Sequence, residues 1–200
     1  MLYVSAARAV LAEGPAAAGD AFNWPFLPLL LAGAGKVTGL DPAFWGTLYS
    51  VLSLALVSVL AVRIAHYLGA HLVWPVLLFV LGAPLFNEYR ADLLRDTGAW
   101  ALLLLALERL LAWLRTGGWR AAAGFQAALA GAILFRPESA FVALVLPFWL
   151  LFARGWRALW RDGAVLLGGF AVIALIGLTF ALGSDSDIQG RLHEAASMVN

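Results

Sequence analysis

Cysteine is absent from this sequence, lysine occurs once (Lys36), and charged residues of either sign are few. Without cysteine there are no disulfide frameworks, thiolate nucleophiles or cysteine-based zinc and iron–sulfur sites. Charged residues make up 12% of the 200 residues, whereas soluble globular domains carry about 25%. This deficit, with a net charge of only +1, excludes a soluble enzyme, a nucleic-acid binder and a disordered tail.

Hydrophobic residues make up 63% of the chain and fall in long runs between the charges. Mean hydropathy is +0.88, which indicates a polytopic α-helical membrane protein. Six runs are candidate spans: 42–62, 72–87, 97–114, 121–135, 139–153 and 163–184. The adjacent short runs 121–135 and 139–153 fit either two tilted spans, which we favour, or one re-entrant hairpin. We therefore predict an all-α transmembrane helix bundle of about six spans.

The regions before and after these spans are more polar, and we predict that the whole chain forms one integral-membrane domain. Residues 1–41 are expected to form an outer loop with one or two interfacial helices. One is an amphipathic segment at 2–13 with Leu2, Ala6 and Val10 on one face, and another is the short apolar segment 24–35. Residues 42–182 are the predicted bundle, and 183–200 an outer polar tail.

Orientation is predicted from the loops that are basic and almost free of acids. The segments 115–120 and 154–161 have this character, which is typical of cytoplasmic loops. Nearby tryptophans are expected to form an interfacial belt: Trp113, Trp119, Trp156 and Trp160. Glu108 and Arg109, close to the end of their run, are expected to extend their charged groups to the membrane surface.

A first cluster of charges, at 87–96, lies on the opposite, outer side in this topology. If the segment is helical, Glu88, Asp92 and Asp96 share one face, because they are four residues apart. With Arg90 and Arg95 they could line a cavity that holds a catalytic carboxylate and phosphate-binding guanidinium groups. The alternative is ordinary helix capping at Asn87, with the acids favoured by the helix dipole and neutralised by the arginines.

A second cluster is the turn Arg136-Pro137-Glu138 between two short apolar runs. An arginine there could hold a lipid phosphate through two parallel hydrogen bonds. The alternative is a local Arg136–Glu138 ion pair in the turn. Elsewhere, Asp41 before Pro42 has the pattern of a helix N-cap. The small residues Gly124, Ala128 and Gly131 predict close helix packing.

The order of these features resembles the membrane glycosyltransferases of family 39, which have the C-type fold and include relatives of protein O-mannosyltransferases and of lipid A aminoarabinose transferases. The resemblance covers most of residues 2–160 and rests on four short patterns. They are Tyr3…Ala7-Arg8…Leu11, Trp24-Pro25-Phe26…Pro28, Pro84…Tyr89-Arg90…Arg95-Asp96 and Ala130-Gly131…Phe135-Arg136-Pro137-Glu138.

The resemblance implies transfer of a sugar from a polyprenyl-phosphate-linked donor to a glycan, lipid or protein acceptor, on the periplasmic face of a bacterial cell membrane. It implies that Asp96 and Asp92 are catalytic carboxylates and that Arg136 binds the donor phosphate. From the charge cluster at 87–96 itself, we add Glu88 to the catalytic carboxylates and Arg95 and Arg90 to the groups that bind the phosphate. No metal or other cofactor is predicted. The family's first helix and its main acidic residue have no counterpart here, so we expect the chain to be truncated at both ends. The alternative function is a small membrane transporter or a non-catalytic membrane scaffold.

Overall fold

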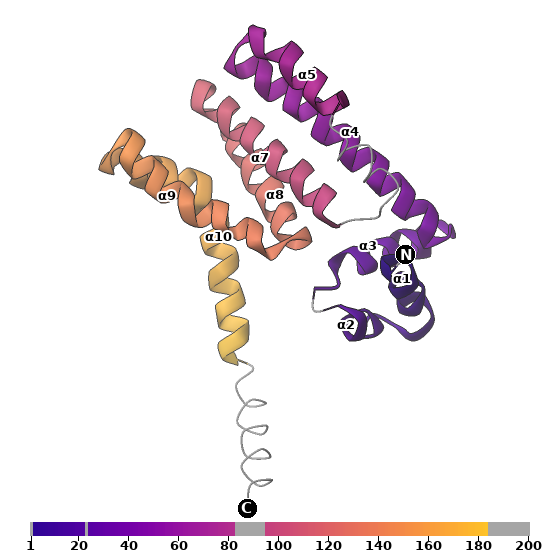
Figure 1. Ribbon diagram of the computed structural model, residues 1–200. Coiled ribbons are helices and arrows are strands. Elements are labelled where there is room, and N and C mark those ends of the chain that lie inside the picture. The colour runs from indigo at the N-terminus through magenta and orange to yellow at the C-terminus, as the bar shows by residue number, and fades with distance from the viewer. Residues whose placement is uncertain (1, 23, 83–94, 184–200) are drawn as a thin grey trace, which may run out of the picture. The chain divides into compact units, whose positions relative to one another are not determined.

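The computed structural model describes residues 2–22, 24–82 and 95–183, and every regular element in them is helical (Figure 1). The α-helices are α1 (Leu2–Glu13), α2 (Ala17–Ala21), α3 (Phe26–Thr38), α4 (Pro42–Leu68), α5 (Val73–Gly82), α7 (Arg95–Thr116), α8 (Trp119–Phe135), α9 (Ala140–Arg154) and α10 (Trp156–Gly183). Two short 3₁₀ turns, η1 (Ala70–Leu72) and η2 (Pro137–Ser139), precede α5 and α9. The predicted all-α fold is confirmed for these residues.

Three helical segments of the described residues are long and apolar enough to cross a bilayer. They are Pro42–Leu68, Asp96–Thr116 and Pro137–Arg154, with α9 continuing from η2 in the last. Much of their apolar surface is exposed: on α4, the side chains of Val51, Leu52 and Val59 face outward. Such surfaces suit lipid rather than water, so the three helices suggest a membrane protein. The predicted count of six spans is not confirmed.

Local sequence accounts for several helix boundaries. Asp41 caps α4 as predicted, because its carboxylate accepts a hydrogen bond from the Ala43 amide at 2.7 Å, and Pro42 fits the first turn. Gly117, with φ of +64°, ends α7 in a left-handed conformation. Only one further residue separates it from α8, so α7 and α8 form a tight helical hairpin.

The contacts between α4, α7 and α8 fix their directions. Tyr49 meets Gly98, Arg63 meets Glu108, and Arg115 meets the backbone of Tyr67. Residue numbers along α4 rise with those of their contact partners along α7, so the two helices run parallel. Helix α7 contacts both α4 and α8 and lies between them.

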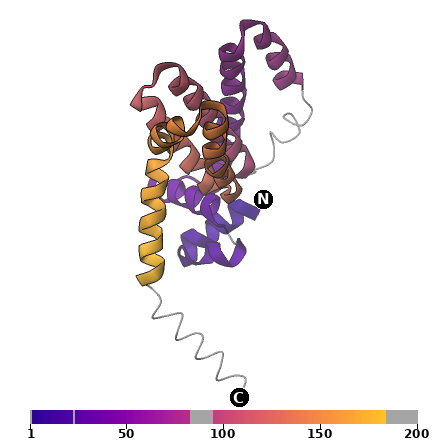
Figure 2. The same cartoon turned by 90° about the vertical axis from the view of Figure 1, so that its left-hand side faces the viewer.

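Helix α8 runs antiparallel to α7 through its small residues. Gly124 lies against Arg109, and Gly131 against Leu102. Ala128, between these glycines, is buried. The close packing predicted from the three small residues is thus confirmed. Figures 1 and 2 show that α5 folds back beside the second half of α4.

The N-terminal helices pack on one end of this bundle. Ala7 of α1 and Leu27, Leu31 and Ala32 of α3 form a buried core. Partly buried side chains from the bundle pack against it: Trp45, Tyr49 and Phe135. We call this end, where α4 and α7 begin and α8 stops, the Arg136 end. The opposite end, where α7 turns into α8, is the Arg115 end.

The amphipathic helix predicted at 2–13 is confirmed in its position, and its predicted face is confirmed in part, since Ala6 is buried and Val10 packs against the core. The buried side chains of α1 are Val4, Ala6 and Ala7, whereas Leu2 is largely exposed. The helix packs against α3 and uses the face that fits this neighbour. The prediction for Trp113 was also wrong, because Trp113 is 7% exposed and packs inside the protein. Trp119, Trp156 and Trp160 are exposed, as an interfacial belt requires.

The described chain divides into two compact units, with the boundary between Leu146 and Pro147. In the second unit, Gly155 (φ +82°) separates α9 from α10. Asp162 accepts hydrogen bonds from Arg154 Nη1 at 3.1 Å and from Arg161 Nε at 2.8 Å. The hydrogen bond and charge of Arg161, followed by those of Arg154, hold the pKa of Asp162 below its usual value.

Candidate functional site

Arg136 and Asp96 form an ion pair at the Arg136 end of the bundle. The guanidinium Nη1 lies 3.2 Å from Asp96 Oδ1, and Nε lies 3.4 Å from Glu138 Oε2. The side chains of Arg136 and Asp96 are 38% and 33% exposed, so both remain partly accessible to a ligand. The local turn pairing with Glu138 is therefore present, and a second partner comes from α7.

Backbone geometry brings these side chains together. Asp96 lies in the first turn of α7, where the helix dipole favours a carboxylate. Arg136 follows the last residue of α8 in an extended conformation, and its amide donates to Ala132 O at 2.8 Å. Since α7 and α8 are antiparallel, the beginning of one and the end of the other meet at the same level of the bundle.

An aromatic cluster supports the pair from α3, α4 and α8. The Tyr49 ring stacks on Phe135 with centroids 5.6 Å apart, and Phe26 meets Phe135 edge to face at 5.0 Å. The Tyr49 hydroxyl accepts a hydrogen bond from the Gly98 amide at 3.0 Å. Phe135 directly precedes Arg136, so this packing fixes the position of the turn. The sequence did not predict the role of Tyr49, because the contact joins residues 49 positions apart.

Ser139 is a further residue at this end that sequence reasoning missed. It is 5% exposed, and its hydroxyl oxygen has no hydrogen-bond partner within the described part of the chain. Buried hydroxyl groups in native proteins are usually hydrogen-bonded. Its position directly after Glu138 adds a buried polar atom beside the Arg136 turn.

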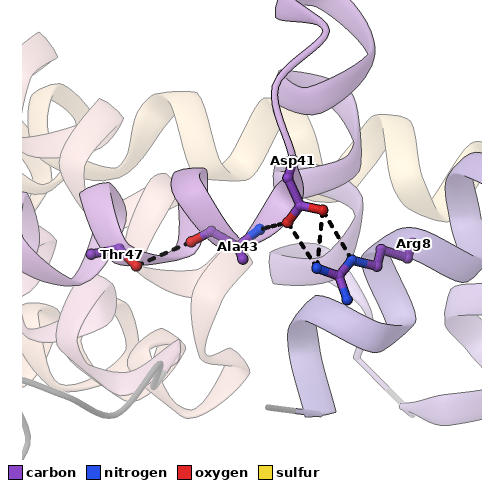
Figure 3. A network of polar contacts seen from close by, with 4 residues as sticks. All are labelled: Arg8, Asp41, Ala43 and Thr47. Carbon is purple, nitrogen blue, oxygen red and sulfur yellow. Dashed lines mark hydrogen bonds and ion pairs between the residues drawn. The ribbon is translucent and has the colours of Figure 1, made fainter.

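A groove lies at the same end, between α1, α3 and α4. It has a volume of about 530 Å³ and is lined by Arg8, Leu11, Ala12, Gly35, Gly39, Leu40, Asp41 and Pro42. Figure 3 shows Arg8 pairing with Asp41 while Asp41 caps α4. Arg8 Nε and Nη2 lie 3.2 and 3.0 Å from Asp41 Oδ2. The hydrogen bond from Arg8, followed by that from the Ala43 amide, lowers the pKa of Asp41 below its usual value.

Several predicted site residues fall outside the described residues. Glu88, Arg90 and Asp92 belong to 83–94, and the side chain of Arg95 is likewise not described. Their assignment stays a prediction. Of the six predicted site residues, the structure therefore places the side chains of Asp96 and Arg136, and it brings these two together.

The expectation for Glu108 was wrong. Glu108 is 1% exposed, and its Oε1 accepts a hydrogen bond from Arg63 Nη2 of α4 at 2.6 Å. Arg109 Nε lies 3.0 Å from Oε2. Glu108 thus points between the helices rather than toward the membrane surface, because α4 supplies a cation that the sequence of α7 alone does not reveal.

The described residues contain no group of three or more histidine, aspartate or glutamate side chains placed to hold a metal ion. Comparison with known proteins adds no relative: no family model, curated protein or solved structure matches this chain.

Proposed function

We propose that this chain belongs to a membrane glycosyltransferase that moves a sugar from a polyprenyl-phosphate donor to an envelope acceptor. The acceptor is a glycan, a lipid or a protein, and the reaction takes place on the periplasmic face of a bacterial cell membrane. The observation that carries the proposal is the Arg136–Asp96 pair, 3.2 Å apart and partly exposed at one end of an apolar bundle. Charged groups beside membrane spans are costly and commonly mark a functional site.

The two side chains have the chemistry that such a transfer needs. The acceptor hydroxyl gives its proton to the Asp96 carboxylate while its oxygen forms the new bond to the anomeric carbon of the sugar. The bond from that carbon to the phosphate oxygen breaks, and its electron pair leaves with the polyprenyl phosphate. Arg136 stabilises this leaving phosphate by charge-assisted hydrogen bonds.

The distribution of charge supports placing this end on the outer side. At the Arg115 end, Arg109, Arg115 and Arg120 flank the α7–α8 connection, with Glu108 as the nearby acid. Short connections rich in arginine tend to stay in the cytoplasm. The Arg136 end carries Asp41, Asp96 and Glu138 as well as its arginines. This orientation presents Arg136 to a polyprenyl phosphate at the periplasmic surface.

Photocrosslinking tests the proposal without depending on turnover. Membranes that contain the full chain are irradiated with a polyprenyl phosphate that carries a diazirine near its headgroup, and labelled peptides are identified by mass spectrometry. We expect label near Arg136, competed by unlabelled polyprenyl-phosphate sugar and not by polyprenyl alcohol. Arg136→Gln should lower labelling about tenfold, because a hydrogen bond to a charged group contributes about 1.5–3 kcal/mol.

The matched control is Arg120→Gln, which removes one exposed arginine from the opposite end of the bundle. The amount of label near Arg136 in this variant should equal that in the unaltered chain. Equal labelling of Arg136→Gln at equal expression would overturn the proposal and favour the turn as a purely structural feature.

The buried Glu108 is the observation that bears on the alternative of a transporter. An ionisable residue inside a bundle often belongs to an ion or proton pathway. Here the carboxylate bridges Arg63 and Arg109, which accounts for it as a structural link between α4 and α7. Proton or solute flux into vesicles that contain the chain, abolished by Glu108→Gln, would favour the transporter instead.

A further inference from the structure

A second groove lies at the Arg115 end, between the last turns of α4 and the start of α5. It has a volume of about 460 Å³ and is lined by Val62, Arg63, His66, Tyr67 and Val73. Valine side chains supply apolar walls, while Arg63, His66 and Tyr67 supply groups that can donate hydrogen bonds. This combination suits a ligand with a charged head and an apolar body.

The length of α4 places the groove at the depth of a bilayer interface if α4 crosses the membrane. Helix α4 has 27 residues and is therefore about 40 Å long, whereas the hydrocarbon core is about 30 Å thick. Arg63 to Leu68, its last turns, thus reach the headgroup region if the middle of α4 crosses the core. Two exposed tryptophans at this end, Trp74 (70%) and Trp119 (72%), fit the same level.

Positive charge dominates this end of the bundle. Arg63, Arg109, Arg115 and Arg120 face a single carboxylate, Glu108, among the described residues of the adjoining segments. Arg115 uses neutral partners: its guanidinium lies over the Tyr67 ring at 4.6 Å and donates to the Tyr67 carbonyl. The local charge is therefore not balanced within this region and favours an anionic partner.

Arg63 is the residue best placed to bind such a partner. Its side chain is 51% exposed although Nη2 is held by Glu108 at 2.6 Å. A guanidinium has five N–H groups in a rigid fork, so the ion pair with Glu108 fixes its orientation through Nη2 and does not use all of its donors. A preorganised donor loses less entropy on binding than a free side chain does.

We propose that this groove binds the headgroup of an anionic phospholipid from the adjoining leaflet. Arg63 and His66 contact the phosphate, and Val62 and Val73 contact the glycerol and the upper acyl chain. This site is separate from the Arg136–Asp96 pair and does not depend on the proposed transferase activity.

Native mass spectrometry of the detergent-solubilised full chain tests this site with two defined lipids. Dioleoylphosphatidylglycerol should remain bound in a one-to-one complex under activation that removes dioleoylphosphatidylcholine. The double variant Arg63→Gln/Glu108→Gln leaves no unpaired buried carboxylate and does not change net charge, yet it should reduce phosphatidylglycerol retention about tenfold. Val73→Trp, which fills the groove from α5 without touching the ion pair, should have the same effect.

Lys36→Gln is the matched control, because it removes an exposed cation from α3 at the other end of the bundle. It should retain phosphatidylglycerol as the unaltered chain does. Equal retention of the two lipids by the unaltered chain would overturn the proposal. The proposal would also be overturned if either groove variant folds and retains as much phosphatidylglycerol as the unaltered chain. If the double variant does not fold, the result for Val73→Trp decides the question.

Discussion

Arg63 of α4 donates a hydrogen bond to the buried carboxylate of Glu108 in α7 at 2.6 Å. This bond joins two parallel helices through residues that are 45 positions apart in the sequence. The contact is asymmetric: the Arg63 side chain is 51% exposed, whereas Glu108 is 1% exposed. Arg109 lies on the other carboxylate oxygen at 3.0 Å. The acid is therefore held between two cations, and only Arg63 comes from another helix.

Replacing Arg63 alone should destabilise the bundle more than replacing Arg63 and Glu108 together. Arg63→Met leaves Glu108 buried with Arg109 as its remaining cation, and we expect a loss of about 3 kcal/mol, near the lower limit for breaking a buried pair. Arg63→Met/Glu108→Met should recover most of this loss, because no buried carboxylate remains and Arg109, which is 39% exposed, can be solvated by water. Thermal unfolding of the detergent-solubilised variants measures both effects. A double variant less stable than Arg63→Met would contradict the assignment.

The contact between α4 and α7 at the Arg136 end should depend on Gly98. A Cβ at this position would overlap the Tyr49 hydroxyl and lie 3.0 Å from Tyr49 Cε2. We expect Gly98→Ala to lower stability by about 1–3 kcal/mol through overpacking. In Gly98→Ala/Tyr49→Phe the overlapping hydroxyl is gone, so the combined loss should be smaller than the sum of the single losses.

Gly33→Ala provides the control for Gly98→Ala. Gly33 lies inside α3, and a Cβ there would meet nothing within 4 Å. Alanine favours helix over glycine by about 1 kcal/mol, so this variant should be as stable as the unaltered chain or more so. If both alanine variants behave alike, the Tyr49 contact does not limit the approach of the helices.

Asp41 should make stability depend on acid pH. Its pKa in the folded protein lies below the usual aspartate value, so its ionised form stabilises the fold above the unfolded-state pKa, and this contribution disappears as pH falls through the folded pKa. Asp41→Asn keeps a capping oxygen but loses the charge. The difference in melting temperature between the unaltered chain and Asp41→Asn should therefore be largest near neutral pH and vanish in acid.

Arg8→Gln tests the cause of this pH dependence, because the Arg8 hydrogen bond is the main reason for the lowered pKa of Asp41. In the Arg8→Gln background, Asp41→Asn should change the melting temperature at neutral pH by less than it does in the unaltered chain. A difference in melting temperature that is independent of pH would show that the capping bond alone matters.

If the proposed function is correct, substitutions of Asp96 and of Arg136 should have different effects on donor binding and on sugar transfer. Asp96→Asn removes the carboxylate that competes with phosphate for Arg136, so polyprenyl-phosphate photolabelling should be retained or increased. Sugar transfer should fall by about 10²-fold or more, because the proton acceptor is lost. Arg136→Gln should lower both. Labelling and transfer from a radiolabelled donor, measured on the same membranes, decide between these patterns, and parallel losses in both variants would argue against the assigned roles.

Local sequence signals predicted the elements that depend on near neighbours. The runs at 42–62 and 97–114 correspond to α4 and α7, and the amphipathic segment at 2–13 corresponds to α1. The cap at Asp41 was recognisable because the side chain bonds to an amide only two residues away. Such features are encoded within one or two turns of helix and need no knowledge of the fold.

The predictions that were wrong concern neighbours distant in sequence. Glu108 and Trp113 are close to the end of an apolar run, which favours exposure at an interface, yet both are buried. The count of six spans, which rested on apolar length alone, is not contradicted but stays unconfirmed, because helices such as α8, with 17 residues, are short. Arg136 and Asp96 were each recognised as candidates, but their 3.2 Å contact depends on the antiparallel packing of α7 and α8.

By itself, the sequence determined that this protein is built from apolar helices with charges kept to their ends, because hydrophobic runs and helix caps act over short distances along the chain. Only the tertiary structure decided which charges meet. The pairing of Arg63 with Glu108 and of Arg136 with Asp96 follows from the relative direction and register of α4, α7 and α8. Register is set by small residues and side-chain packing across helices, and no local pattern in the sequence reports it.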